Sequence, residues 1–165
     1  MRQYSIKTIA WLAMAVGLWA AVEVTWAQQE LFVIAPSGEN VESKRDEINK
    51  RCDTKRHHFM TINRNAFDRK GLLLNLFDDT KFKIRIDKID KPENISGEAK
   101  EIWYGEVDGA KVSDVMIFIY DDYITGRINS DNRLFMIERA DNGLAAIVEI
   151  DKSKMVTESN SVKVK

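Results

Sequence analysis

The sequence is poor in the residues that usually carry chemistry. It has 165 residues but one cysteine, two histidines and two prolines. A single cysteine excludes a disulfide within the chain. It contains no H-E-x-x-H pair, glycine-rich phosphate loop, G-x-S-x-G elbow or C-x-x-C pair. These motifs typify metallopeptidases, NTPases, serine hydrolases and dithiol sites. We therefore expect a protein that is not an enzyme and uses no cofactor.

An excess of charge of one sign is also missing. Lys and Arg together number 25 and Asp and Glu 26, which gives a formal net charge of −1. Loss of Arg2, Lys7 and Glu23 with a leader segment would change this to −2. Nucleic-acid-binding proteins show a basic surplus gathered on one face. We therefore expect no nucleic-acid partner.

Residues 1–27 have the pattern of a signal peptide. Two basic residues precede an uncharged apolar run over residues 8–22, and Thr-Trp-Ala ends at Ala27 with small residues where signal peptidase reads the chain. The run has 15 residues, whereas a bilayer-spanning helix needs about 20. We expect cleavage after Ala27 and a secreted or periplasmic protein. The alternative is a membrane anchor formed by residues 8–22.

The remaining chain divides into residues 28–56, 57–151 and 152–165. The first part contains a predicted strand over residues 30–34 and a polar stretch that could dock as a helix only through Val41 and Ile48. We interpret it as a short strand followed by a polar linker or loosely docked helix. The last part is a polar C-terminal tail.

From residue 57 to 151 apolar residues alternate, and turn residues recur about every eight to twelve positions. Phe82, Ile84 and Ile86 share one face of a strand whose other face is charged. The predicted strands cover residues 57–62, 72–77, 81–87, 101–107, 115–120, 123–129, 133–139 and 144–150. With residues 30–34 this makes about eight or nine short strands in hairpin order. We expect a mainly β protein, an antiparallel β-sandwich or half-open barrel.

Three local features refine this expectation. The alternation slips at residues 88–89, which indicates a bulge or a strand end. Residues 115–120 carry no polar side chain on either face, which predicts a central strand buried on both sides. Asp121-Asp122 and Asn142-Gly143 predict hairpin turns.

Candidate catalytic or metal-binding side chains are few. His57 and His58 are adjacent, so a strand directs them to opposite faces and they cannot easily share one centre. Asp78-Asp79 and the aspartate pair that follows residue 120 stand where strands end, and aspartate there usually turns the backbone. No D-x-D-x-D-G loop supports calcium binding. An enzyme could start only from His57 or His58 beside Asp78 or Asp79.

Aromatic residues gather in adjacent predicted strands, namely Trp103, Tyr104, Phe118, Tyr120 and Tyr123. A glycan-binding platform would need them exposed on one flat face. Their alternation divides them between two faces, so we expect most to pack in the core.

Cys52 is the one cysteine, and it lies in a polar, cation-rich segment. Flanking cations favour a thiolate, which is a good zinc ligand. Cys52 is thus a candidate zinc ligand in trans, and the alternative is an incidental thiol.

A run of motifs between residues 57 and 151 resembles one protein family. An L-N-L-F-D-D turn is followed by a W-x-G-x-V strand, an apolar strand, a G-x-I strand and a last strand ending in E-x-D. The matching positions include Leu74, Asn75, Leu76, Phe77, Asp78, Asp79, Trp103, Gly105 and Gly126. The order resembles the N-terminal pro-domain of secreted bacterial zinc metallopeptidases of the reprolysin (adamalysin-like) class. The first motif is the specific one, whereas the others are common in β-sheets.

The resemblance implies a module that precedes a zinc peptidase, assists its folding and keeps it latent. In some branches of the family a pro-domain cysteine binds the catalytic zinc, but Cys52 lacks a clear switch motif around it. The sequence departs from the family because no peptidase domain follows, and Lys165 is its last residue. A truncated peptidase precursor, a stand-alone module acting on a separate peptidase, and a β module in another role all remain open.

The leading functional hypothesis is therefore an exported, non-enzymatic module that binds a metallopeptidase as inhibitor or folding assistant. Such binding could use an edge strand, since strand addition relies on main-chain hydrogen bonds and leaves little trace in sequence. The alternative is a cell-envelope module that binds glycan or protein. It would require an exposed aromatic or apolar patch. A membrane contact is expected only through an uncleaved signal segment.

Overall fold

A computed structural model describes residues 29–35, 41–92, 99–140 and 143–159. The strands are β1 (Phe32–Ile34), β2 (Thr54–Ile62), β3 (Gly71–Phe77), β4 (Thr80–Asp90), β5 (Glu101–Val107), β6 (Ser113–Ile119), β7 (Ile124–Ser130), β8 (Arg133–Arg139) and β9 (Leu144–Ile150). The helices are α1 (Glu42–Asn49), α2 (Lys152–Ser159) and a short 3-10 helix (Arg64–Ala66). The predicted signal peptide, residues 1–27, lies outside the described residues.

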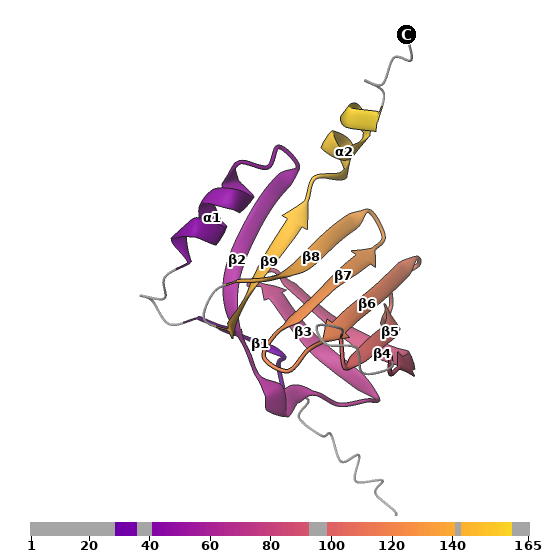
Figure 1. Ribbon diagram of the computed structural model, residues 1–165. Helices are drawn as coiled ribbons and strands as arrows, with labels where there is room; N and C mark the ends of the chain where they lie inside the picture. Colours follow the sequence, from indigo (N-terminus) through magenta and orange to yellow (C-terminus); the bar gives the residue numbers. More distant parts are fainter. Residues whose placement is uncertain (1–28, 36–40, 93–98, 141–142, 160–165) are drawn as a thin grey trace, which may run out of the picture.

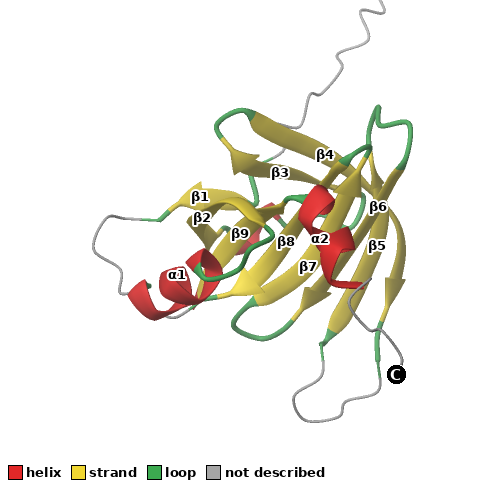
Figure 2. Cartoon of the chain, turned by 90° about the horizontal axis from the view of Figure 1, so that it is seen from above, coloured by secondary structure: helices red, strands yellow, loops and turns green. Residues whose placement is uncertain are grey.

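The nine described strands form one antiparallel sheet in the order β1-β2-β9-β8-β7-β6-β5-β4-β3. Strands β3 to β9 follow one another as neighbours, and β9 then pairs with β2. The sheet curls until its two edges meet, where a parallel bridge joins Glu30 to Leu73 (Figures 1 and 2). The expected mainly β fold is confirmed, and of the two architectures the chain adopts the nearly closed barrel.

Side chains fill the interior of this barrel. Alternate residues of each strand point inward, as the period of two in the sequence predicts. The fully buried interior residues include Phe32, Leu72, Leu74, Leu76, Ile84, Ile117, Ile128, Phe135, Ile137 and Ile147. Aromatic rings meet near the middle, where the centroid of Phe135 lies 5.5 Å from that of Phe82 and 6.3 Å from that of Phe77. The interior is therefore a packed core.

A second, smaller core lies outside the barrel wall under α1. Val41 and Ile48 of the α1 region are buried there against Phe59, Ala146 and Val148. Figure 2 shows α1 beside β2 and β9. These two apolar anchors are the ones that the sequence indicates.

Ion pairs hold the two ends of α1 to the sheet. Glu138 on β8 receives Lys44 at 2.9 Å and Arg51 at 2.5 Å. Burial alone would raise the pKa of the Glu138 carboxyl. Hydrogen bonds from Lys44 and Arg51 outweigh this effect and leave the pKa below its ordinary value. The helix is thus docked more firmly than the expected linker or loosely docked helix.

The strand buried on both faces is β9 and not the one predicted. Every residue from Leu144 to Ile150 is buried, because one face of β9 lines the interior and the other lies under α1. In β6, Val115 and Ile117 are buried but Met116 and Phe118 are only half-buried. The prediction of a doubly buried strand at residues 115–120 is therefore wrong. Apolar side chains on the outer face of β6 have no helix above them among the described residues.

The predicted bulge and the turn at residues 121–122 are confirmed. The register of β4 against β5 shifts between Ile86 and Lys88, where the sequence pattern slips. Residues 121–122 connect β6 to β7. Of the predicted Asn142-Gly143 turn, Asn142 lies outside the described residues, and Gly143 has a φ of 73°, a conformation that glycine adopts without strain. Strand β2 begins at Thr54, three residues before the predicted start.

Candidate binding site at the barrel seam

The two histidines lie on opposite faces of β2, as predicted. His57 lies on the side that α1 covers and packs edge-on against Phe59, with ring centroids 5.6 Å apart. His58 lies on the inner side, where its ring centroid is 6.4 Å from that of Phe77. Burial, together with the positive charge of Arg45 and His58, lowers the pKa of His57. They do not converge on one centre.

Cys52 is exposed, immediately before β2. Within the described ranges, no group of three or more His, Cys, Asp and Glu side chains is placed to hold a metal ion. A role of Cys52 as a zinc ligand in trans therefore stays a prediction that rests on the sequence alone.

The L-N-L-F-D-D motif forms the end of β3 and its turn into β4. Leu74 and Leu76 are fully buried and Phe77 is 7 % exposed, all in the main core. Asp78 and Asp79 form the turn, which confirms the turn interpretation. Asp79 accepts hydrogen bonds from Arg56 and Thr80, which lower its pKa to about 2.

The other motif positions also serve the fold. Trp103 is buried, and its Nε1 donates to Glu101 Oε2 at 2.7 Å. At Gly105 an added Cβ would lie 2.1 Å from the carbonyl oxygen of Arg85, and at Gly126 it would lie 2.7 Å from that of Met116. Both glycines therefore allow neighbouring strands to approach closely.

The aromatic side chains do not form one exposed platform. Trp103 is buried, whereas Tyr104, Phe118, Tyr120 and Tyr123 are half-buried. Tyr120 and Tyr123 stack at 4.2 Å beside the β6–β7 turn, and Arg139 covers Tyr123 at 4.3 Å. The expected division between faces is confirmed for Trp103 and Tyr104, but of the five rings only Trp103 is buried, so the expectation that most of them pack in the core is wrong.

A charged cluster closes one end of the barrel. The side chain of Glu149 is 2 % exposed and pairs with Arg56 at 2.6 Å, Lys55 at 2.9 Å and Arg133 at 3.1 Å. Both arginines also donate to Thr80 Oγ1 at the start of β4, next to the β3–β4 turn. Burial raises the pKa of Glu149, but hydrogen bonds from the three cations outweigh it and hold the pKa at about 2. The cluster is satisfied internally, so it ties β2, β8 and β9 to the β3–β4 turn.

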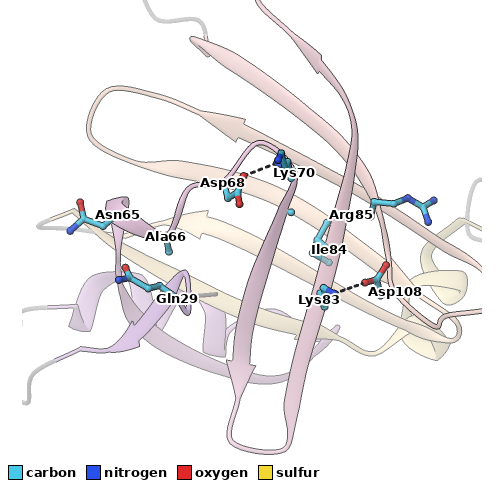
Figure 3. Close-up of a pocket in the computed structure, with 10 residues that line it drawn as sticks. Gln29, Asn65, Ala66, Asp68, Lys70, Lys83, Ile84, Arg85 and Asp108 are labelled. Atoms are coloured by element: carbon cyan, nitrogen blue, oxygen red, sulfur yellow. Dashed lines mark hydrogen bonds and ion pairs between the residues drawn. The ribbon is translucent and has the colours of Figure 1, made fainter. Parts of the chain in front are cut away.

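A surface hollow of about 770 Å³ lies beside the 3-10 helix and β4 (Figure 3). Its charges of both signs are interleaved, and several of them are paired. Lys83 lies 3.5 Å from Asp108, the Asp68 carboxylate accepts from the backbone N–H of Lys70, and Arg85 pairs with Asp87 and Glu106. Figure 3 shows the Arg85 side chain directed away from the others. The hollow lacks side chains that converge on one ligand.

The seam, where β1 meets β3, is closed at only one end. Leu31 N donates to Leu73 O at 2.9 Å. One step further, the side chain of Asn75 replaces the main chain: its Oδ1 accepts from Phe32 N at 3.1 Å and its Nδ2 donates to Glu30 at 3.0 Å. Lys81 completes this closure with an ion pair to Glu30.

Beyond Asn75 the two edges have no strand between them in the described chain. β1 pairs with β2 as far as Met60, although β2 extends to Thr54. β3 continues to Phe77 with β4 as its partner on one side. β1 stops where Pro36 follows, since proline cannot donate to a strand ladder. The sequence carries that signal, but it does not show that the opposite edge continues.

Ile34 shows that the seam is open. It pairs with Met60, and Phe32 pairs with Ile62, so Ile34 shares the inner face of β1 with Phe32. Phe32 is fully buried, whereas Ile34 is 61 % exposed. Among the described residues, this inner-face isoleucine thus has no neighbour that covers it.

A groove of about 300 Å³ runs along this open end, which we call the seam groove. It is lined by Glu30, Val33, Ile34, His58, Met60, Asn75, Phe77, Asp78 and Lys81. Sequence analysis singled out Asn75, Phe77 and Asp78 as motif residues and His58 as a candidate, and the structure brings these four together. It missed Val33, Ile34 and Met60, because a pattern of alternation cannot show that an inner face is left uncovered.

Closure of the seam by Asn75 can be tested by replacing it with leucine, which has a similar size but cannot accept from Phe32 N. A buried N–H without an acceptor costs about 1–3 kcal/mol. We expect N75L to lose about 2 kcal/mol of unfolding free energy in urea denaturation, and the Phe32 amide to exchange hydrogen faster. Lys81→Met, which removes only an exposed ion pair, is the control and should cost under about 1 kcal/mol. Unchanged stability with a protected Phe32 amide would contradict this role.

No protein-family model, curated protein or solved structure matches the chain. In the described part of the chain, neither helix is long and apolar enough to cross a bilayer.

Proposed function

We propose that this protein is an exported, non-enzymatic module that binds a partner protein at its open seam. The observation that carries the proposal is Ile34, an inner-face residue of an edge strand that is 61 % exposed. Val33 beside it is 50 % exposed. Exposed apolar side chains next to an unpaired sheet edge are the features by which extended segments bind through strand addition.

The packed interior supports contact at the surface. The centre of the barrel is occupied by Phe82, Phe135 and their neighbours, so a ligand cannot enter as it does in wide barrels that enclose a cavity. The seam groove is small and has apolar walls of Met60 and Phe77. It suits one or two side chains of a partner.

The partner that we propose is a zinc metallopeptidase, which the resemblance of the L-N-L-F-D-D region to a pro-domain implies. The module would act as inhibitor or folding assistant by covering part of the peptidase surface. Signal-peptide-like residues 1–27 support export to the compartment where such peptidases work.

The test is direct binding of the purified full-length chain to the purified zinc metallopeptidases that the same organism secretes. We expect a complex in light scattering and slower peptide hydrolysis, or faster recovery of peptidase activity after dilution from denaturant, at micromolar concentration. Ovalbumin and a serine peptidase are the controls. Absence of a complex at 100 µM, a concentration at which about −5.5 kcal/mol of binding free energy is detectable, would reject the metallopeptidase as partner.

A cell-envelope module is the second candidate. The stacked pair Tyr120 and Tyr123, capped by Arg139, is the observation that favours it. Burial of Trp103 removes the largest ring from any glycan platform. Sedimentation with isolated cell-wall glycan, abolished by Tyr123→Ala, would select this function instead.

A further inference from the structure

We infer that the seam groove binds an extended segment of the partner in which an apolar side chain stands next to a lysine or arginine. The inference rests on the proposed function for the nature of the partner, and it specifies the chemistry of the bound segment. Three features of the groove support it: an exposed inner-face isoleucine, strand edges without a neighbouring strand among the described residues, and an aspartate without an ion-pair partner there.

The apolar step starts from Ile34. Its side chain, Met60 and Phe77 line one groove, and Met60 and Phe77 are 2 % and 7 % exposed. Phe77 is fixed between Phe135, 6.3 Å away, and the Arg56 guanidinium, which lies 4.0 Å from its ring centroid. The floor of the groove is therefore preformed. A leucine-sized side chain seated on this floor would give Ile34 the neighbour that it lacks.

The main-chain step follows from the strand edges. On one side of the groove β2 runs on from Met60 to Thr54 without a strand on its seam side among the described residues. On the other side lies the outer edge of β3 from Asn75 to Phe77. At one end of this stretch Asn75 accepts from Phe32 N, and at the other the hydrogen bond from Arg56 to Asp79 joins β2 to the β3–β4 turn. A segment of about four extended residues spans the length of β3 and turn between these contacts, at about 3.3 Å per residue.

The charge step concerns Asp78. Four other charged groups around the groove are already paired: Glu30 with Lys81, and Asp79 with Arg56. Asp78 is exposed and lines the groove, and it has no ion-pair partner in the described ranges. A cation on the bound segment would complete this rim, whereas a carboxylate there would be repelled.

The experiment measures binding of three synthetic peptides to the full-length chain by fluorescence anisotropy. They are acetyl-Ser-Leu-Lys-Leu-Lys-Ser-amide, the same peptide with glutamate for lysine, and the same peptide with serine for leucine, each with a dye on its C-terminal side. We expect the first of these, the leucine–lysine peptide, to bind at least about tenfold more tightly than the serine peptide, because the serine peptide has no leucine side chain to bury. Equal binding of all three would overturn the inference.

Variants locate the site. Ile34→Asp should weaken the leucine–lysine peptide about tenfold or more, whereas Val112→Asp is the matched control, since Val112 is 66 % exposed outside the groove. Asp78→Asn should reduce the preference for lysine over glutamate about threefold, as an exposed ion pair does. Circular dichroism of each variant checks that the barrel is intact. If Val112→Asp and Ile34→Asp act alike, the groove is not the site.

Two other occupants would give different results. One is the chain's own C-terminal segment, residues 160–165, which ends in Val-Lys-Val-Lys. The binding measurements therefore include a variant that lacks these six residues. A several-fold gain in peptide affinity on their removal would assign the groove to this chain's own tail and overturn the partner segment. Dimers in light scattering that Ile34→Asp converts to monomers would assign it to a second copy, with the same consequence.

The same variants separate this inference from the proposed function. If the metallopeptidase binds Ile34→Asp as well as the unmodified chain, the function stands and the groove assignment fails. If the leucine–lysine peptide binds at the groove but no metallopeptidase does, the groove assignment stands and the proposed partner fails.

Discussion

Replacement of Glu149 by glutamine is expected to lower the free energy of unfolding by about 3–5 kcal/mol at neutral pH, the usual cost of removing one partner of a buried ion pair. Glutamine keeps the size of the side chain but leaves Lys55, Arg56 and Arg133 around a neutral group. The measurement is urea denaturation of both proteins at pH 7. Glu106→Gln is the matched control, because it removes an exposed carboxylate that pairs with Arg85 and should cost under about 1 kcal/mol.

The acid dependence of this difference follows from the pKa of Glu149, which lies at about 2 against an ordinary value of 4.5. Because the pKa is lower in the folded chain than in the unfolded chain, the ionised carboxylate stabilises the fold above about pH 5. This contribution, about 3 kcal/mol, is lost as the pH falls from about 5 to about 2. The difference in unfolding free energy between the unmodified chain and E149Q should therefore become smaller over that pH range. A gap that stays constant down to pH 2 would show that Glu149 does not act through its charge.

Replacement of Gly105 by alanine is expected to cost about 3 kcal/mol, at the upper end of what overpacking usually costs. The added Cβ would lie 2.1 Å from the oxygen and 3.1 Å from the carbon of the Arg85 carbonyl, both of them backbone atoms of β4. Relief requires β4 and β5 to separate beside the bulge at residues 86–88. For a domain of this size the melting temperature should fall by about 10 °C in differential scanning calorimetry.

The neighbouring residue provides the control for Gly105→Ala. Glu106→Ala lies on the same strand with its side chain exposed, so we expect a change within about 0.5 kcal/mol. If both variants melt together with the unmodified chain, β4 and β5 accommodate a methyl group here, and the glycine is not required by close approach.

The fold class could be predicted because each strand carries its own signal. Phe82, Ile84 and Ile86 alternate with charged residues, and β4 follows that pattern with its charged face outside. The bulge in β4 was visible as a slip in the same alternation. These features are local, since a period of two is fixed by the backbone of a single strand.

The candidate site could be predicted only in part. The L-N-L-F-D-D run singles out Asn75, Phe77 and Asp78, which do line the seam groove. Ile34 escaped because its alternation with Phe32 predicts an ordinary inner-face residue. Whether such a residue is covered depends on β3, some 40 positions away in the chain. A local sequence pattern carries no information about how close so distant a strand comes.

Alternation and turn residues were sufficient by themselves to determine antiparallel strands joined in hairpin order. The tertiary structure alone decided that the sheet curls into one nearly closed barrel, that α1 covers β9 and not β6, and that the seam stays open beyond Asn75. The physical reason is that strand formation depends on neighbours in sequence, whereas closure depends on how twist and side-chain volume accumulate around nine strands.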